Sequence, residues 1–131
     1  MFPTKVLVSE HVIEIYGTRY HHHKNGGGLV AETAKVADSA FIGVRAMVDG
    51  KANVLDSAYI ADTATITGSA LISGHAFVGG SAIVAMNAHI SDNAHVSGDV
   101  EIEGNARISR NARVRGSSSI RLRIDGNTCI D

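Results

Sequence analysis

The sequence AYIADT ATITGS ALISGH AFVGGS, residues 58–81, decides the fold, because each block of six residues has Ala first and Val or Ile third. The same pattern runs from Gly28 to Ile120 without an insertion or a deletion. A strict short period indicates a solenoid, and a period of six residues predicts a parallel β-helix.

Two positions of each repeat are expected to face inward. Alternate side chains of a strand point to opposite sides, so the Ala position and the aliphatic position two residues later share one side. From Ala34 onward the Ala position departs from Ala only at Val100 and Ser118. Burying a Val or Ile stabilises a fold by about 1.5–3 kcal/mol, so these side chains predict the core. The aliphatic column is Val36, Ile42, Val48, Val54, Ile60, Ile66, Ile72, Val78, Val84, Ile90, Val96, Ile102, Ile108, Val114 and Ile120.

The residues between these positions predict tight corners. Pairs such as Asp56-Ser57, Gly74-His75 and Asp92-Asn93 combine residues that tolerate a left-handed backbone with side chains that bond nearby amides. A corner in every repeat leaves only short strands, which pair with the equivalent strand of the next coil.

On these residues the chain resembles the hexapeptide-repeat left-handed parallel β-helix superfamily, as in residues 36–41 (VADSAF) and 72–77 (ISGHAF). It is closest in style to uncharacterised bacterial and phage hexapeptide-repeat proteins. The resemblance implies an all-β fold, a single-stranded left-handed parallel β-helix of about five triangular coils with a short N-terminal β segment. The left hand comes from the resemblance alone, since the crossover rule favours the right hand.

Residues 1–27 precede the solenoid and are expected to form an N-terminal β cap or docking arm. Residues 5–8, 12–16 and 19–23 predict short strands, and residues 24–28 (KNGGG) predict a flexible joint. An open solenoid end needs a cover, so the segment is expected to cap the rod or lie along it. Exchange of the segment between subunits is the alternative.

The repeat covers residues 28–120, and its phase slips at Leu122 and Ile124. Residues 121–131 are therefore expected to form a C-terminal closing segment and not another full coil.

The outward position between the two inward ones forms three columns when the sequence is read in steps of three repeats. Coils stack about 4.8 Å apart, so neighbours in a column are expected to touch. The columns are Lys35, Asn53, Leu71, His89 and Arg107; Phe41, Tyr59, Phe77, His95 and Arg113; and Leu29, Met47, Thr65, Ile83, Glu101 and Ser119.

The second column contains an aromatic ladder that predicts an oligomer interface, because contiguous exposed apolar surface marks interaction sites. Beside it runs a strip of small residues, Gly43, Ala61, Gly79 and Ser97. The family resemblance implies a homo-oligomer, with a trimer favoured. Two alternatives stay open: residues 1–25 cover the ladder within the chain, or the ladder faces a different partner or a ligand. The expected interface residues are Phe41, Tyr59, Phe77, His95, Met47 and Ile83.

Arginines gather near the C-terminal end, and they suggest either a solvated, ion-paired end or an anion-binding site. The guanidinium group suits bidentate contact with phosphate or carboxylate. The candidate residues are Arg107, Arg110, Arg113 and Arg115.

The leading hypothesis is a non-catalytic structural or interaction protein that self-associates through the aromatic face and binds an anionic small molecule or an acidic protein at its Arg-rich end. One alternative is an acyltransferase of the hexapeptide-repeat class with an intersubunit site. The unbroken repeat argues against it, because family members that catalyse acyl transfer usually add an extruded loop and a catalytic His. Another alternative is a protein that sequesters a nucleotide-like anion with Arg113 or Arg115, His95 and Tyr59.

Histidines suggest two possible metal sites, and neither is favoured. The γ-class carbonic anhydrases share the resemblance, but His89 and His95 are expected to point apart within one subunit, and the family's spacing is not reproduced. His21 and His23 lie on one side of a strand and could bind a metal, although a polar connecting segment is the simpler interpretation. We therefore predict no metal and no cofactor.

The composition of the chain limits the partners and the cellular location that we expect. The formal net charge is −1, which gives no reason to expect nucleic acid or an anionic membrane surface as a partner. The N-terminus does not resemble a secretory signal, and no apolar run approaches the roughly 18 residues of a membrane helix. Cys129 is the single cysteine, so no intramolecular disulfide is possible and a cytoplasmic location is expected.

Overall fold

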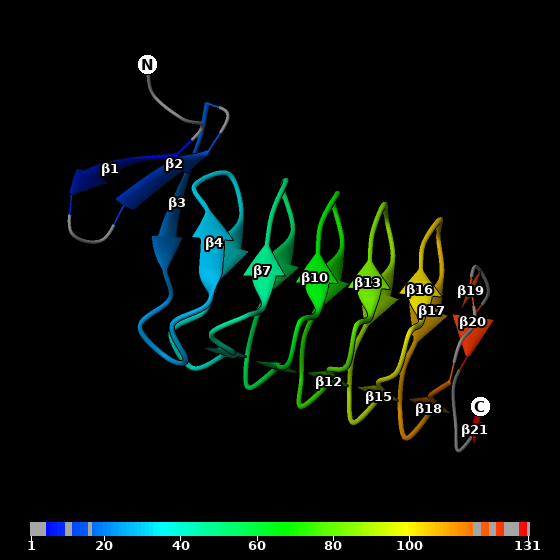
Figure 1. Cartoon of the computed structure of the whole chain (residues 1–131). Helices are drawn as coiled ribbons and strands as arrows, with labels where there is room; N and C mark the ends of the chain where they lie inside the picture. Colours follow the sequence, from blue (N-terminus) through cyan, green and yellow to red (C-terminus); the bar gives the residue numbers. More distant parts are fainter. Residues whose placement is uncertain are drawn as a thin grey trace.

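The computed structural model describes residues 17–116 in full, together with the backbone of strands at 5–9, 12–15, 119–120, 123–124 and 129–130. These strands form a rod with three parallel sheets along its sides, which we name sheets A, B and C (Figure 1). The predicted all-β solenoid of about five triangular coils with an N-terminal β segment is confirmed.

Sheet A contains β1 (Lys5–Ser9), β2 (Val12–Ile15), β3 (Thr18–His22), β4 (Leu29–Ala31), β7 (Met47–Val48), β10 (Thr65–Ile66), β13 (Ile83–Val84), β16 (Glu101–Ile102) and β19 (Ser119–Ile120). Sheet B contains β5 (Lys35–Val36), β8 (Asn53–Val54), β11 (Leu71–Ile72), β14 (His89–Ile90), β17 (Arg107–Ile108) and β20 (Arg123–Ile124). Sheet C contains β6 (Phe41–Ile42), β9 (Tyr59–Ile60), β12 (Phe77–Val78), β15 (His95–Val96), β18 (Arg113–Val114) and β21 (Cys129–Ile130).

Each coil contributes one strand to each sheet. Coil one contains β4, β5 and β6, and coils two to five follow in order, so that coil five contains β16, β17 and β18. Within the rod each strand pairs in parallel with the equivalent strand of the neighbouring coil, as Phe77 does with Tyr59 and His95. This register is eighteen positions, or three repeats, so the outward columns expected from the sequence are present on the three faces.

The core is a stack of aliphatic side chains, as predicted. From Ile42 to Val114 every residue of the aliphatic column is 0% exposed, and the Ala positions between Ala40 and Ala112 are also buried. Val36 differs because it is only partly buried. The reason is its position at the open end of sheet B, where β5 has no preceding coil to cover it.

Left-handed backbone at the corners turns the chain from one sheet to the next. Gly and Asp provide most of these positions, but Met86 (φ 60°) and Arg110 (φ 58°) also adopt the conformation, which the sequence did not indicate. Asp corners link neighbouring coils, because Oδ2 of Asp56 accepts a hydrogen bond from the Gly74 amide at 3.0 Å. Asp92 accepts one from the Arg110 amide in the same way.

The N-terminal strands extend sheet A as an antiparallel meander. The backbones of β1, β2 and β3 pair in sequence, and β3 pairs antiparallel with β4 at the first coil. Figure 1 shows β1 and β2 beyond the end of the rod and away from β12, β15 and β18 of sheet C. The described strands of this segment therefore do not lie across the aromatic column.

The joint between the meander and the rod is held by hydrogen bonds, in contrast to the flexible linker expected from its glycines. Ile42 donates its amide to the Asn25 carbonyl at 3.0 Å, and the Gly28 amide donates to the Ile42 carbonyl at 2.9 Å. The Asn25 side chain donates to the Ala40 carbonyl. This segment therefore covers the backbone edge of sheet C that coil one leaves open.

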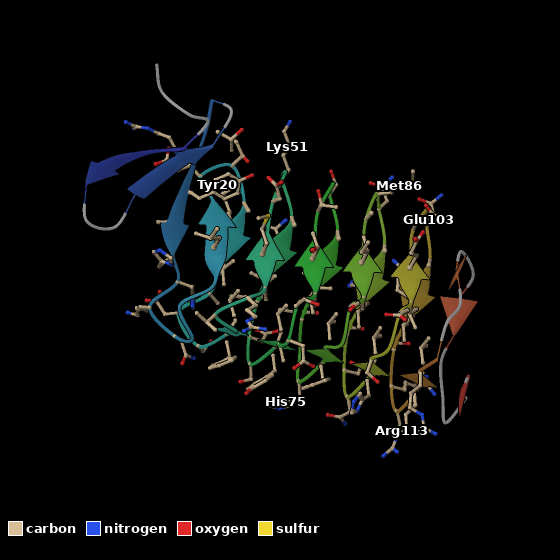
Figure 2. The ribbon with its side chains drawn as sticks, in the orientation of Figure 1. Tyr20, Lys51, His75, Met86, Glu103 and Arg113 are labelled. Carbon is tan, nitrogen blue, oxygen red and sulfur yellow. The ribbon has the colours of Figure 1, made fainter. Side chains whose placement is uncertain are left out.

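Tyr20 and His23 connect the meander to the first coils (Figure 2 labels Tyr20). Tyr20 is the buried residue of β3, and its pKa is raised by burial, then by the negative charge of Asp49 and by a side-chain hydrogen bond to that carboxylate. His23 is also buried, and its Nε2 lies 3.1 Å from the Ala37 carbonyl while its Nδ1 accepts the Asn25 amide.

Strands β20 and β21 continue sheets B and C beyond coil five. Arg107 pairs with Arg123, sixteen positions along the chain, whereas Asn53 pairs with Leu71, eighteen positions along. The slip expected after Ile120 thus corresponds to a register that is two positions shorter. The closing segment expected to be less than a full coil adds one strand to each of these two sheets.

Replacing Gly28 with Ala is expected to lower the free energy of unfolding by about 1–3 kcal/mol. A Cβ atom there would lie 2.3 Å from the Gly43 carbonyl oxygen, and backbone cannot move aside as a side chain can. The matched control is Gly43→Ala, where the nearest atoms lie 3.4 Å away and a change within about 0.5 kcal/mol is expected. Urea unfolding measures both, and equal losses would contradict the steric explanation.

Candidate interaction surface

The outer side of sheet C carries a continuous stack of flat side chains. Phe41 and Tyr59 are parallel with ring centroids 4.3 Å apart, and Tyr59 and Phe77 follow at 5.5 Å. The His95 imidazole continues the stack at 4.6 Å from Phe77, tilted by 53°. The two-residue strands impose this arrangement, because equivalent positions of successive coils pair directly.

Stacking decides which part of each ring is available. Tyr59 and Phe77 use both ring faces against their neighbours in the column, so they present mainly their edges to the outside. Tyr59 is the most exposed ring of the described aromatic column, at 42%. A base or a sugar ring that needs an open aromatic face therefore finds none on Tyr59 or Phe77. The surface suits an apolar partner that packs against ring edges.

The strip of small residues beside the column is not an open groove at Gly79. A Cβ atom built on Gly79 would lie 2.7 Å from Cε1 of Phe77, so the ring lies over this glycine. The small residue allows the aromatic ring to lie close to the sheet, and the strip should be counted as part of the aromatic surface.

Two of the predicted interface residues lie on a different side of the rod. Met47 and Ile83 are in β7 and β13 of sheet A, on the other side of the corner that follows each sheet C strand. Ile83 is 40% exposed, and Val44, at the corner between β6 and β7, is 75% exposed. Val44 was not identified from the sequence, although it stands where several other repeats have Asp or Gly.

The structure distributes the four candidate anion-binding arginines around coil five. Arg107 lies on sheet B with an exposed side chain, and Arg110 forms the corner between sheets B and C. Arg113 lies on sheet C, where Figure 2 labels it. Arg115 follows β18 on the same side as Arg113. Arg113 and Arg115 therefore share one face, whereas Arg107 lies on another.

The two arginines of sheet C affect His95 directly. Burial lowers the pKa of His95 most, and the positive charges of Arg113 and Arg115 lower it further. On sheet B, burial and then Arg107 lower the pKa of His89, while Asp92 acts in the opposite direction. The arginines on sheets B and C of coil five thus create a local positive potential at these two histidines.

The described residues contain no group of three or more His, Cys, Asp or Glu side chains placed to hold a metal ion. His75 is exposed at a corner, and His89 and His95 lie on different sheets. His22 Nδ1 lies 2.8 Å from the Gly27 carbonyl, and both ring nitrogens of His23 have backbone partners. In the part of the chain that the structure describes, no helix is long and apolar enough to cross a membrane.

We expect His95→Gln to weaken the pH dependence of stability. Because the pKa of His95 is lowered in the folded chain, the unfolded chain binds more protons below about pH 6.5. Its contribution is therefore complete above this pH and is lost as the pH falls toward the folded pKa. Urea unfolding at about pH 7.5 and pH 5.5 should show a smaller difference for His95→Gln than for the wild type.

The exposed corner residue His75 provides the control for this measurement. If His75→Gln reduces the pH dependence as much as His95→Gln does, the burial of His95 and its neighbouring arginines are not responsible for the effect.

No family model matches this sequence, and neither a curated protein nor a solved structure matches it.

Proposed function

We propose that this chain is a non-catalytic interaction protein, a rigid β-solenoid that self-associates through the aromatic face of sheet C and meets an anionic partner at coil five. The observation that carries the proposal is the stacked column of Phe41, Tyr59 and Phe77 on the outside of the rod. Its ring edges form a contiguous apolar surface, and such surfaces mark interaction sites.

Several features support a protein partner over a small-molecule ligand. Small-molecule sites are usually concave, whereas the aromatic column lies on the outer side of a sheet. Tyr and Arg are enriched among residues that dominate protein interfaces, and Tyr59 and Arg113 stand in the same column. The rigid rod also lets the partner bind without ordering a flexible segment of this face.

We also propose that the chain belongs to the hexapeptide-repeat superfamily and winds with the left hand of that family. The six-residue period and the three parallel sheets support this assignment. A trimer is the oligomer that the family resemblance favours.

Phe77→Asp is expected to weaken self-association at least about 30-fold, because it places a charge in the centre of the proposed contact. The matched control is Leu71→Asp, which introduces the same charge on sheet B of the same coil and should leave the mass unchanged. Light scattering over a range of protein concentrations measures both variants. A monomeric wild type, or an unchanged mass for Phe77→Asp, would contradict the proposal.

A second candidate is the binding of a phosphate-bearing ligand at coil five, supported by the shared effect of Arg113 and Arg115 on His95. A nucleoside triphosphate should then raise the melting temperature, because binding to the folded state stabilises it. The corresponding nucleoside should not, and Arg113→Gln should remove the effect. Stabilisation by acyl-CoA alone would instead support the acyltransferase alternative.

A further inference from the structure

Charged side chains on the outer faces of sheets A and C gather in the same coil, which means at the same position along the rod axis (here called the same height). Within residues 28–116, all of which are described, sheet C has Arg113 on β18 and Arg115 just after it. Sheet A has Glu101 on β16 and Glu103 just after it. The remaining acid, Asp49, is hydrogen-bonded to Tyr20. Sheet A is thus acidic where sheet C is basic.

The outward columns of sheets A and C also correspond in coils one to four, where neither column contains Asp, Glu, Lys or Arg. At equal height, Leu29 matches Phe41, Met47 matches Tyr59 and Ile83 matches His95 in the outward columns. Three of the large apolar side chains exposed in the described chain are Val44, Tyr59 and Ile83, and they lie on sheet A, on sheet C or at the corner between them. Apolar side chains therefore occupy the outward position of coils one, two and four on sheet A and of coils one to three on sheet C, and Thr65 and His95 are the uncharged exceptions.

Other pairings of sheet C are less favourable. Sheet C against itself with parallel rods brings Arg113 close to its own copy. With antiparallel rods Arg113 faces the end that contains Phe41, where Asp38 already pairs with Lys24 at 3.2 Å. Sheet B offers Lys35 and Arg107 in its column, so at equal height it opposes arginine with arginine.

We propose that in the self-associated form sheet A of a second copy packs on sheet C, with the two rods parallel and their coils at equal height. The inference rests on the proposed self-association and specifies its geometry. Glu101 of one copy then pairs with Arg113 of the next, so the anionic partner of coil five is the acidic end of another copy. Because the two contacting surfaces differ, the contact is heterologous and closes as a ring of three or more copies or continues as a filament.

Charge exchange between Glu101 and Arg113 tests this pairing in the full chain. Glu101→Arg and Arg113→Glu should each weaken association about tenfold at low salt, because each places like charges together. The double variant restores opposite charges and should return to within about threefold of the wild type. Circular dichroism confirms that these outward substitutions leave the fold intact.

Disulfide trapping tests the height of the pairing independently, with Cys129→Ser as the background. A mixture of Ile83→Cys and His95→Cys chains, both in coil four, should form a crosslinked pair on oxidation. A mixture of Ile83→Cys and Phe41→Cys chains, three coils apart, should not.

The outcomes separate the two proposals. A monomeric wild type removes the proposed self-association itself. An associated wild type that Phe77→Asp dissociates, but whose charge exchange is not restored in the double variant, overturns the sheet A pairing alone. A mass of two copies also overturns it, because a closed dimer uses the same surface on both chains.

Discussion

Backbone hydrogen bonds between successive coils are the constraint on which the rest of the structure depends. Tyr59 donates to the Ala76 carbonyl at 2.9 Å and Ala61 donates to the Val78 carbonyl at 2.8 Å, and the same pattern recurs along all three sheets. A strand of two residues makes too few bonds to be stable alone. Each coil must therefore match the next on three sides at once, which requires the same inward volume in every repeat.

This requirement separates the roles of the inward and outward residues. The inward positions repeat Ala and an aliphatic residue because any change of volume would disturb the coils on both sides. The outward positions meet no such demand, and they change from aromatic at Phe41 to histidine at His95 and arginine at Arg113. The three faces consequently differ in chemistry although the core beneath them is uniform. Sheet B, with Lys35 and Arg107 in its column, is chemically distinct from the other two.

Periodicity was sufficient to predict the core, the three columns and the stacking of the aromatic side chains. It could not predict the left-handed backbone of Met86 and Arg110, because neither residue favours it. The neighbouring coil imposes that conformation: a Cβ atom on Gly68 would lie 2.5 Å from the Met86 amide, so the corners stack closely and must share one shape.

The repeat pattern also could not predict how the residues at the N-terminal end of the rod are buried and bonded. Val36 fits the aliphatic column but is only partly buried, because no coil precedes it on sheet B. The glycines before Leu29 suggested flexibility, yet their segment bonds to Ile42, fourteen residues beyond Gly28. The orientation of the rings, with Phe77 lying over Gly79, depends on contacts between side chains that a repeat pattern does not specify.

The register of eighteen positions has a consequence for how such a chain can change in length. Adding or removing one whole coil leaves every later residue on its own face, so the outward columns stay on the sheets that carry them now. Adding or removing a single repeat keeps the core intact but moves every later column to the next face of the rod. The duplication of a coil therefore lengthens the rod without moving any residue to another face. The duplication of one repeat keeps the fold but changes which side chains share each face.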